Sequence, residues 1–229
     1  MLKSYLWIKC WLKKHMSRKI KIYLSSFWVL ISLAATAQVP AGFNVLKDPS
    51  SLKKNLLTEN QKINTIESDF IQEKYLSVLS EKIESKGSFF FKKQNELRWE
   101  YTSPFKYIIV LTGGKMYIKN DGKVSRYNVN SNKMFKGIND MMMSVVNGNL
   151  FENPEYQVKY YSSSSAYLLE LTPVNSTTQK FLKTIQMKVD KLSYEIENVR
   201  MTEPGGDYTN IKFINRKNNV PISDAKFKV

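Results

Sequence analysis

The residue types that most often carry chemistry are scarce in this sequence. Its single cysteine, Cys10, and its single histidine, His15, both lie in the first 37 of 229 residues, which we interpret below as a removed leader. The remainder therefore offers no thiol nucleophile, no disulfide and no histidine-based triad or metal site. These absences predict a protein that holds no metal and no other cofactor.

Carboxylates remain as candidate acid–base groups, but their spacing is unfavourable. Asp69 and Glu73 lie four residues apart in a predicted strand, and Glu96 and Glu100 are spaced in the same way. Four strand residues span about 13 Å, so each pair shares a face of the sheet but is too far apart to act together. The sequence also has no G-x-S-x-G motif and no phosphate-binding loop. We therefore predict that the protein is not an enzyme.

The N-terminal segment has the order of regions found in secretory signal peptides. Residues 1–21 contain seven Lys or Arg and no acidic residue, the apolar run 22–35 follows, and Ala35-Thr36-Ala37 completes a small-residue cleavage site. We predict cleavage after Ala37, which leaves residues 38–229 exported to the periplasm. An uncleaved signal anchor is the alternative, although the run is shorter than the roughly 20 apolar residues that a membrane span needs. Translation could begin at Met1 or at Met16, because Met16 would give a leader of more ordinary length.

The charge surplus is large in the full chain and moderate in the exported part. The full chain has a net charge of +15, and residues 38–229 keep 28 basic and 20 acidic residues, a net charge of +8. The basic residues are spread in short pairs such as Lys53-Lys54 and Arg216-Lys217. This distribution is typical of a solvated surface, with attraction to an acidic membrane face or partner as the alternative. An exported chain without a recognition motif is not expected to bind nucleic acid.

Hydrophobic periodicity predicts a helix, six strands, a second helix and five more strands. The first helix, over about 49–63, begins at Asp48-Pro49, because aspartate is a favoured N-cap and proline is tolerated in the first turn. The second helix, over about 133–147, contains the triplet Met141-Met142-Met143. The predicted strands cover residues 65–76, 81–92, 96–102, 105–112, 115–120, 123–129, 155–162, 166–172, 180–190, 193–203 and 207–214. Gly113-Gly114 and Asp121-Gly122 are hairpin turn signals between three of these strands.

Alternation within the strands indicates how the sheet is arranged. In 96–102, Leu97, Trp99 and Tyr101 face one way, while charged residues between them face the other. An apolar face backed by a charged one is typical of an antiparallel sheet with one wet side. We predict one mostly β domain of the α+β class over 38–229, an open and strongly curved antiparallel sheet or barrel with helices over one side. We expect it to be a monomer.

Four short motifs, taken in order, resemble a known family. They are Phe70-Ile71-Gln72, the segment G-S-F-F-F-K-K-Q-N-E-L-R-W-E-Y-T-S-P over Gly87–Pro104, Gly114-Lys115 and the C-terminal Asp224-Ala225-Lys226-Phe227. Their order and spacing over about 50–229 resemble the periplasmic outer-membrane lipoprotein carrier proteins, the LolA-like family. The resemblance implies an open, strongly curved antiparallel barrel of eleven strands, with helices as a lid over an apolar cavity.

The resemblance also implies a carrier without chemistry. Members of the family accept lipoprotein acyl chains from an inner-membrane lipoprotein-releasing transporter, shield them across the periplasm and deliver them to an outer-membrane acceptor. Exposing acyl chains to water costs about 0.8 kcal/mol per CH₂, so such a carrier needs an apolar cavity. The acylated lipoproteins, the transporter and the acceptor are thus the expected partners.

The resemblance places Leu97 on a cavity hydrophobe of the family and Trp99 on its aromatic residue. Lys93 falls on the family's functional arginine, which ties a strand to the lid and helps the closed lid reopen. Here Lys93-Gln94 replaces the family's Arg-Pro, so the planar fork of arginine is lost. Arg98 could compensate, although alternation puts it on the other face. The residues expected to line the lipid-binding cavity are Phe70, Phe89, Phe91, Leu97, Trp99, Tyr101, Ile138, Met141 and Met142.

Two alternatives remain open. The same fold could carry or sense another lipid or amphiphile, because a fold does not fix a function. An enzyme acting through paired carboxylates is the other alternative. A carrier predicts an amphiphile that co-purifies with the protein, whereas an enzyme predicts turnover.

Overall fold

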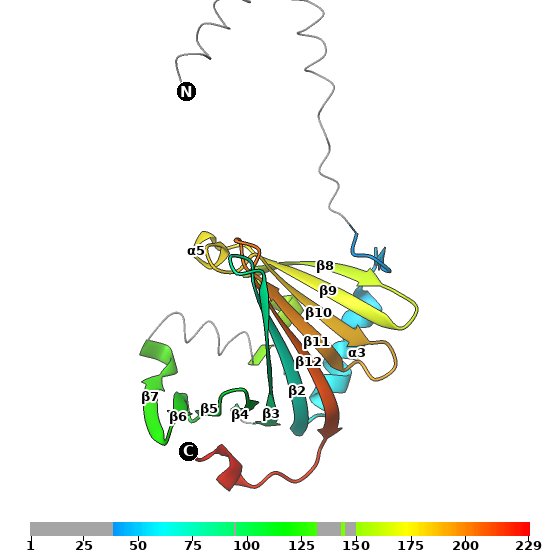
Figure 1. Ribbon diagram of the computed structural model, residues 1–229. Coiled ribbons are helices and arrows are strands. Elements are labelled where there is room, and N and C mark those ends of the chain that lie inside the picture. Colours follow the sequence, from blue (N-terminus) through cyan, green and yellow to red (C-terminus); the bar gives the residue numbers. More distant parts are fainter. Residues whose placement is uncertain (1–38, 94, 132–142, 145–149) are drawn as a thin grey trace, which may run out of the picture. The chain divides into compact units, whose positions relative to one another are not determined.

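The protein is built around one twelve-stranded antiparallel sheet, seen in the computed structural model of Figure 1. The structure describes residues 39–93, 95–131, 143–144 and 150–229. Across the sheet the strands follow the order β1-β8-β9-β10-β11-β12-β2-β3-β4-β5-β6-β7. Their bounds are β1 (Asn44–Val45), β2 (Thr65–Leu76), β3 (Glu81–Lys92), β4 (Glu96–Ser103), β5 (Tyr107–Thr112), β6 (Lys115–Asn120), β7 (Lys123–Asn128), β8 (Tyr156–Ser162), β9 (Ala166–Pro173), β10 (Thr184–Asp190), β11 (Ile196–Thr202) and β12 (Tyr208–Asn218).

The sheet is open and strongly curved. Its edges are β1 and β7, and in Figure 1 the strands from β8 to β3 fan out as one wall while β4 to β7 turn away from it. The predicted fold class, a mostly β domain with a curved antiparallel sheet, is confirmed. The helical elements are α3 (Ser50–Gln61), α5 (Ser176–Gln179) and the 3₁₀ turns η1 (Val129–Ser131), η2 (Leu150–Glu152) and η3 (Asp224–Phe227).

All eleven predicted strands are present, and the structure adds the two-residue strand β1. The first predicted helix corresponds to α3. Of the second predicted helix, over 133–147, only Met143 and Ser144 belong to the described residues, and both are helical. Among the described residues, no helix is both long and apolar enough to cross a bilayer.

Several element boundaries differ from the prediction for local reasons. Helix α3 starts at Ser50, with Pro49 rather than Asp48 at the N-cap position, and the Asp48 carboxylate accepts a hydrogen bond from the Ser50 amide at 2.9 Å. Strand β10 begins at Thr184 instead of residue 180, because the Asn175 side chain caps the short helix α5 just before it. Strand β5 begins at Tyr107 instead of residue 105, because residues 104–106 form the bend that connects it to β4.

The hairpin turns form as the sequence predicts. Gly113 and Gly114 have φ values of 54° and 70°, and Asp121 and Gly122 have values of 47° and 76°. Two consecutive residues with positive φ give the turn whose twist matches that of paired antiparallel strands. These turns fix the register of β5 with β6 and of β6 with β7.

The core consists of two clusters of buried side chains on the sheet. The first cluster is centred on the aromatic residues of β2, β3 and β4 and includes Met143. The second lies between α3 and strands β8 to β11, where Leu52 and Leu56 of the helix pack against the sheet. Met201 and Phe213 are partly buried and contact both clusters. The apolar interior is therefore continuous from the covered half of the sheet to the β2–β4 half.

Candidate functional site

Six of the predicted cavity residues lie together on one face of β2, β3 and β4. We call this set the β2–β4 face; its members are Phe70, Phe89, Phe91, Leu97, Trp99 and Tyr101. Strand pairing brings them into register, because Phe89 lies opposite Trp99 and Phe91 opposite Leu97. All six are buried, from Leu97 at 0% exposed to Tyr101 at 9%. The predicted inward orientation of this face is therefore correct.

The rings of the β2–β4 face pack directly against one another. The Phe70 ring centroid lies 4.7 Å from that of Trp99 and 5.0 Å from that of Tyr101, in tilted and edge-on arrangements. Phe89 meets Trp99 edge-on at 5.2 Å, and Tyr101 stacks on Tyr107 at 4.1 Å. These are favourable aromatic geometries. In this structure the face is closed, and an acyl chain would have to separate side chains that now contact one another.

Gly87 makes this packing possible. It lies opposite Phe70 on β2 and opposite Tyr101 on β4, within the row of residues that face inward. A Cβ atom at this position would lie 2.0 Å from the Glu100 carbonyl oxygen and 2.7 Å from Cζ of Phe70. The Phe70 ring thus occupies the space that a side chain at position 87 would need.

Few polar groups reach the β2–β4 face. The Tyr101 hydroxyl donates a hydrogen bond to Oε1 of Gln72 at 2.9 Å. Burial strongly raises the pKa of Tyr101, and the neighbouring Tyr107 raises it further. Nε1 of Trp99 is nevertheless the one buried side-chain polar atom of the described residues that has no hydrogen-bond partner. A buried donor of this kind is costly unless something accepts its hydrogen.

The other three predicted cavity residues, Ile138, Met141 and Met142, lie outside the described residues. Met143, the neighbour that the prediction left out, is 7% exposed and packs in the same cluster as the β2–β4 face. The prediction also missed Leu111, Met116 and Phe213, which join the cluster from β5, β6 and β12. Alternation within those three strands is the sequence signal that indicates these residues.

Lys93, the predicted lid latch, joins the β3–β4 turn to the end of α3. Its Nζ donates to the carbonyl oxygen of Gln61, the last residue of α3, at 2.6 Å, and its amide donates to the Asn64 carbonyl at 2.8 Å. A cation at the C-terminal end of a helix is favourable, because the free carbonyls there carry partial negative charge. Lys93 therefore connects a strand turn to the end of a helix, and its role as a lid latch stays a prediction.

Arg98 does not reinforce that latch. It lies on the opposite face, where its Nη1 donates to the carbonyls of Lys226 and Lys228 at 3.2 and 3.3 Å and its Nε contacts Glu100 at 2.8 Å. Arg98 thus holds the C-terminal turn η3 against the outside of β4. Side chains alternate along β4, so Arg98 points away from the face that holds Leu97 and Trp99. It therefore cannot take the place of Lys93 in the contact with α3.

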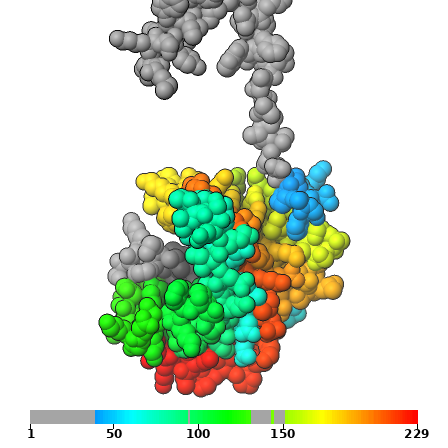
Figure 2. All heavy atoms as spheres, viewed as in Figure 1, coloured from blue at the N-terminus to red at the C-terminus, as the bar shows by residue number. Residues whose placement is uncertain are grey.

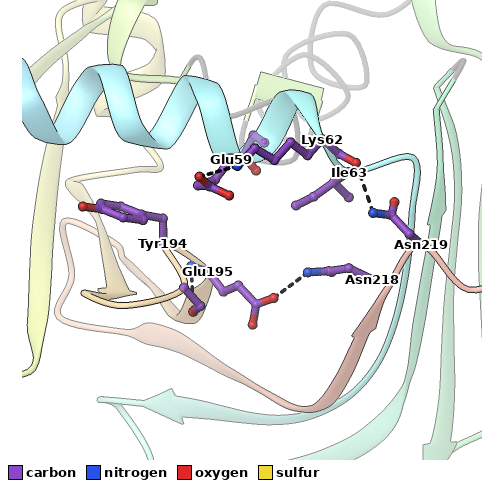
Figure 3. Close-up of a pocket in the computed structure, with 9 residues that line it drawn as sticks. Glu59, Lys62, Ile63, Tyr194, Glu195, Asn218 and Asn219 are labelled. Carbon is purple, nitrogen blue, oxygen red and sulfur yellow. Dashed lines mark hydrogen bonds and ion pairs between the residues drawn. The ribbon is translucent and has the colours of Figure 1, made fainter.

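A pocket of about 210 Å³, lined mainly by residues with polar side chains, lies at the end of α3, between this helix, the β10–β11 turn and the end of β12 (Figure 3). Its lining includes none of the predicted cavity residues. Asn218 donates to Glu195 at 2.5 Å, Asn219 donates to the Lys62 carbonyl at 3.1 Å, and Lys62 pairs with Glu59 at 2.7 Å. Because these groups satisfy one another, the pocket is better understood as the anchor of the α3 end than as an acyl-chain site.

The carboxylates considered for catalysis have separate structural partners. Asp69 accepts from Ser88 and Asn215, at 3.0 Å each, while Glu73 accepts from Tyr208 at 2.7 Å and pairs with Lys82. The Tyr208 hydrogen bond, more than Lys82, lowers the pKa of Glu73. Within the described part of the chain, no three His, Cys, Asp or Glu side chains are grouped as a metal site would require.

Comparisons with known proteins agree with this architecture. Residues 61–229 match the family described as outer membrane lipoprotein carrier protein LolA. An outer-membrane lipoprotein carrier protein of Methylococcus capsulatus is 22% identical over 181 residues, which cover 79% of this chain and 82% of the relative.

Solved structures that match this chain include a LolA superfamily protein of Nitrosomonas europaea, at 10% identity and a TM-score of 0.40, covering 77% of this chain and 97% of that one. A conserved protein of Thermus thermophilus has 8% identity and a TM-score of 0.49, with 79% and 93% covered. The family match extends over most of the chain and contains the β2–β4 face, the Lys93 contact and η3. The chain belongs to the LolA family of outer membrane lipoprotein carrier proteins.

Proposed function

We propose that this protein is a periplasmic chaperone that binds the acyl chains of lipoproteins at the β2–β4 face and carries them from the inner to the outer membrane. In this proposal residues 1–37 are a signal peptide, cleaved after Ala37. An inner-membrane lipoprotein-releasing transporter loads the carrier, and an outer-membrane acceptor receives the cargo. The protein itself performs no reaction.

One observation carries the proposal: the β2–β4 face of a LolA-family chain is almost entirely apolar, aromatic and turned inward on a curved sheet. Aromatic and aliphatic side chains can cover acyl chains that would otherwise cost about 0.8 kcal/mol per CH₂ in water. The cluster also continues, through Met201 and Phe213, into the apolar layer beneath α3. A chain several carbons long could therefore extend from one cluster toward the other once the packing opens.

The Trp99 indole supports a specific orientation of the cargo. Its N–H is a buried donor with no acceptor in the described part of the structure. Lipoprotein acyl chains are attached through ester and amide groups, whose carbonyl oxygens are hydrogen-bond acceptors. We propose that Nε1 of Trp99 donates to such a carbonyl when cargo is bound, so that the acyl chains lie against Phe70 and Phe89.

A carrier must also release its cargo, which requires open and closed states of different affinity. The closed packing of the β2–β4 face and the contact between Lys93 and the end of α3 are consistent with a closed state. We propose that cargo enters as α3 moves away from the sheet, with Lys93 as the latch between them.

Native mass spectrometry of the protein, purified without detergent from the periplasm of an expressing host, tests the proposal. We expect a complex with a triacylated lipoprotein, or its formation on adding a synthetic triacylated lipopeptide. A bound free lipid that excludes the lipopeptide would instead favour a carrier of another lipid. Absence of any complex with the lipopeptide would contradict the proposal.

A further inference from the structure

The turns at one end of the sheet carry large apolar side chains that the fold does not use. In the β2–β3 turn, residues 77–80, Val78 is 92% exposed and Leu79 is 59% exposed. In the connection between β9 and β10, residues 174–183, Val174 is 62% exposed and Phe181 is 56% exposed. We call these four residues the apolar tip. Isolated exposed apolar residues are common on proteins, but a group of four in neighbouring turns is typical of an interaction site.

Strand register places both turns at the same end of the sheet. A row of paired residues runs across four strands, from Thr184 on β10 to Thr202, then to Tyr208, and then to Tyr75 on β2. Both apolar turns lie just beyond this row. In Figure 1 the α5 connection, the β11–β12 turn and the β2–β3 turn lie side by side at the top of the sheet, and their surfaces meet there in Figure 2.

Hydrogen bonds hold the first turn in place. The Ser77 amide and hydroxyl both donate to Oδ1 of Asp207 in the β11–β12 turn, at 2.8 and 2.5 Å. Within the turn, the Leu79 amide donates to the Leu76 carbonyl at 3.2 Å. These hydrogen bonds hold the turn in a conformation that leaves Val78 and Leu79 exposed.

The second turn is anchored on one side and exposed on the other. Leu182 is 8% exposed and packs in the cluster beneath α3, while its neighbour Phe181 points away. The Lys183 amide donates to the Thr202 carbonyl at 2.7 Å, and the Gln179 side chain donates to the Pro173 carbonyl at 2.7 Å. The anchor therefore fixes Phe181 on the outside.

The charges of the second turn indicate which partner this surface fits. Residues 174–183 contain Lys180 and Lys183 and no acidic residue, and neither lysine forms an ion pair among the described residues. Of the nearby acidic side chains, Glu203 pairs with Lys74 at 2.5 Å and Asp207 binds Ser77. Glu81 and Glu155 flank the two turns and form no ion pair among the described residues, so the lysines of the second turn are balanced only in part. Exposed aromatic and aliphatic groups beside free lysines match the interface of an anionic membrane, where side chains enter the acyl boundary and ammonium groups meet phosphates.

We propose that the apolar tip, with Lys180 and Lys183, docks this protein on an anionic phospholipid surface. The tip is separate from the β2–β4 face, so docking does not depend on the proposed cargo. Docking would place the end of the sheet at the membrane from which acyl chains are taken or to which they are delivered.

Flotation with vesicles tests the proposal. The protein is purified from a host periplasm and mixed with phosphatidylcholine vesicles made with or without phosphatidylglycerol. We expect flotation with the phosphatidylglycerol vesicles and a loss of about tenfold in partitioning for the variants Val78→Ser/Leu79→Ser and Phe181→Ser. Leu192→Ser is the matched control, because Leu192 is also 92% exposed but lies in the β10–β11 turn at the other end of the strands.

Four results would overturn the docking proposal. They are failure of the unmodified protein to float with either vesicle, equal flotation with both vesicles, unchanged flotation of the tip variants, and an equal loss in Leu192→Ser. Lipopeptide binding is measured on the same variants by native mass spectrometry. Retained lipopeptide binding without flotation would reject the docking surface alone, and flotation without lipopeptide binding would reject the carrier function alone. Unchanged flotation of the tip variants with impaired delivery to acceptor membranes would assign the tip to a protein partner and also reject lipid docking.

Discussion

At the scale of single residues, Gly87 determines how closely the aromatic rings can pack. We predict that Gly87→Ala destabilises the protein by about 1–3 kcal/mol, the usual cost of inserting an atom into a filled core. The reason is the 2.0 Å approach of a Cβ atom to the Glu100 carbonyl oxygen, a backbone atom that cannot move without shifting β4. Urea unfolding followed by circular dichroism gives the change in the free energy of unfolding.

Gly205→Ala provides the control for that measurement. Gly205 is exposed, its φ is not positive, and a Cβ atom there would have nothing within 4 Å. We expect it to be neutral or slightly stabilising, because alanine reduces the freedom of the unfolded chain. Similar stabilities of the two variants would show that the space beside Phe70 is not filled as described.

Lys93 permits a test of the proposed latch. Leucine keeps the apolar stem but cannot donate to the Gln61 carbonyl, so we expect Lys93→Leu to weaken the closed form and to speed release of a bound lipopeptide to acceptor vesicles. Lys93→Arg should release at the normal rate, because it restores a donor. Lys62→Leu is a matched control, since Lys62 is a neighbouring exposed lysine whose ammonium group, among the described residues, pairs with Glu59 alone. Unchanged release by Lys93→Leu would remove Lys93 from the mechanism.

The sequence predicted which residues of β2, β3 and β4 face inward, because the side-chain period of a strand is two. It could not predict how those residues pack. The packing depends on strand register and on the curvature of the sheet, which bring together residues far apart in the chain. Only this arrangement sets the Phe70 ring beside Gly87 and leaves the Trp99 N–H without a partner among the described residues. Alternation in β12 could place Phe213 on the inward face, but only the sheet order brings that face beside β2.

At the scale of elements, the C-terminal turn η3 closes the outside of β4. Arg98 donates to two of its carbonyls, Lys92 pairs with Asp224, and the Phe227 side chain is 2% exposed. We predict that Arg98→Lys, which keeps the charge but loses the planar fork, weakens this docking and speeds hydrogen exchange of residues 223–229. Lys212→Arg, on β12, is a control for a charge-preserving change. Unaltered exchange in Arg98→Lys would contradict the assignment.

Acidification should release the same element. The hydrogen bond from Lys92 lowers the pKa of Asp224 below its ordinary value of 3.8. A carboxyl group whose pKa is lower in the folded protein contributes stability above its unfolded pKa, and that contribution is lost as the pH falls through the folded pKa. We therefore expect residues 223–229 to lose exchange protection as the pH falls below 3.8, whereas Asp224→Asn should show weak protection with little pH dependence. The prediction fails if Asp224→Asn retains the pH dependence of the unmodified protein.

Element boundaries were predicted well where local signals were strong. Turn glycines and alternating residues located β2 to β7 almost to the residue. The prediction ran β10 four residues too far toward the N-terminus, because residues 180–183 connect the short helix that Asn175 caps to the start of the strand. Strand β1 has only two residues and exists because it pairs with β8, so no local pattern could indicate it.

At the scale of the whole molecule, the sheet order separates three surfaces. The inward β2–β4 face is apolar, the outward face of β4 carries charged residues and η3, and one end of the sheet carries the apolar tip. The first is proposed to hold cargo, the second stabilises the wall that forms it, and the third is proposed to meet the membrane. This arrangement allows a carrier to contact a bilayer without exposing its cargo face to water.

The most direct test of the central claim uses Trp99, the only tryptophan in residues 38–229. A triacylated lipopeptide with brominated acyl chains is titrated into the exported protein, and the fluorescence of Trp99 is recorded. If acyl chains bind at the β2–β4 face, bromine quenches Trp99 saturably at about one lipopeptide per protein, and an unbrominated lipopeptide reverses the quenching by competition. If the brominated lipopeptide binds by native mass spectrometry while Trp99 fluorescence stays unchanged, the acyl chains lie elsewhere and the account is wrong.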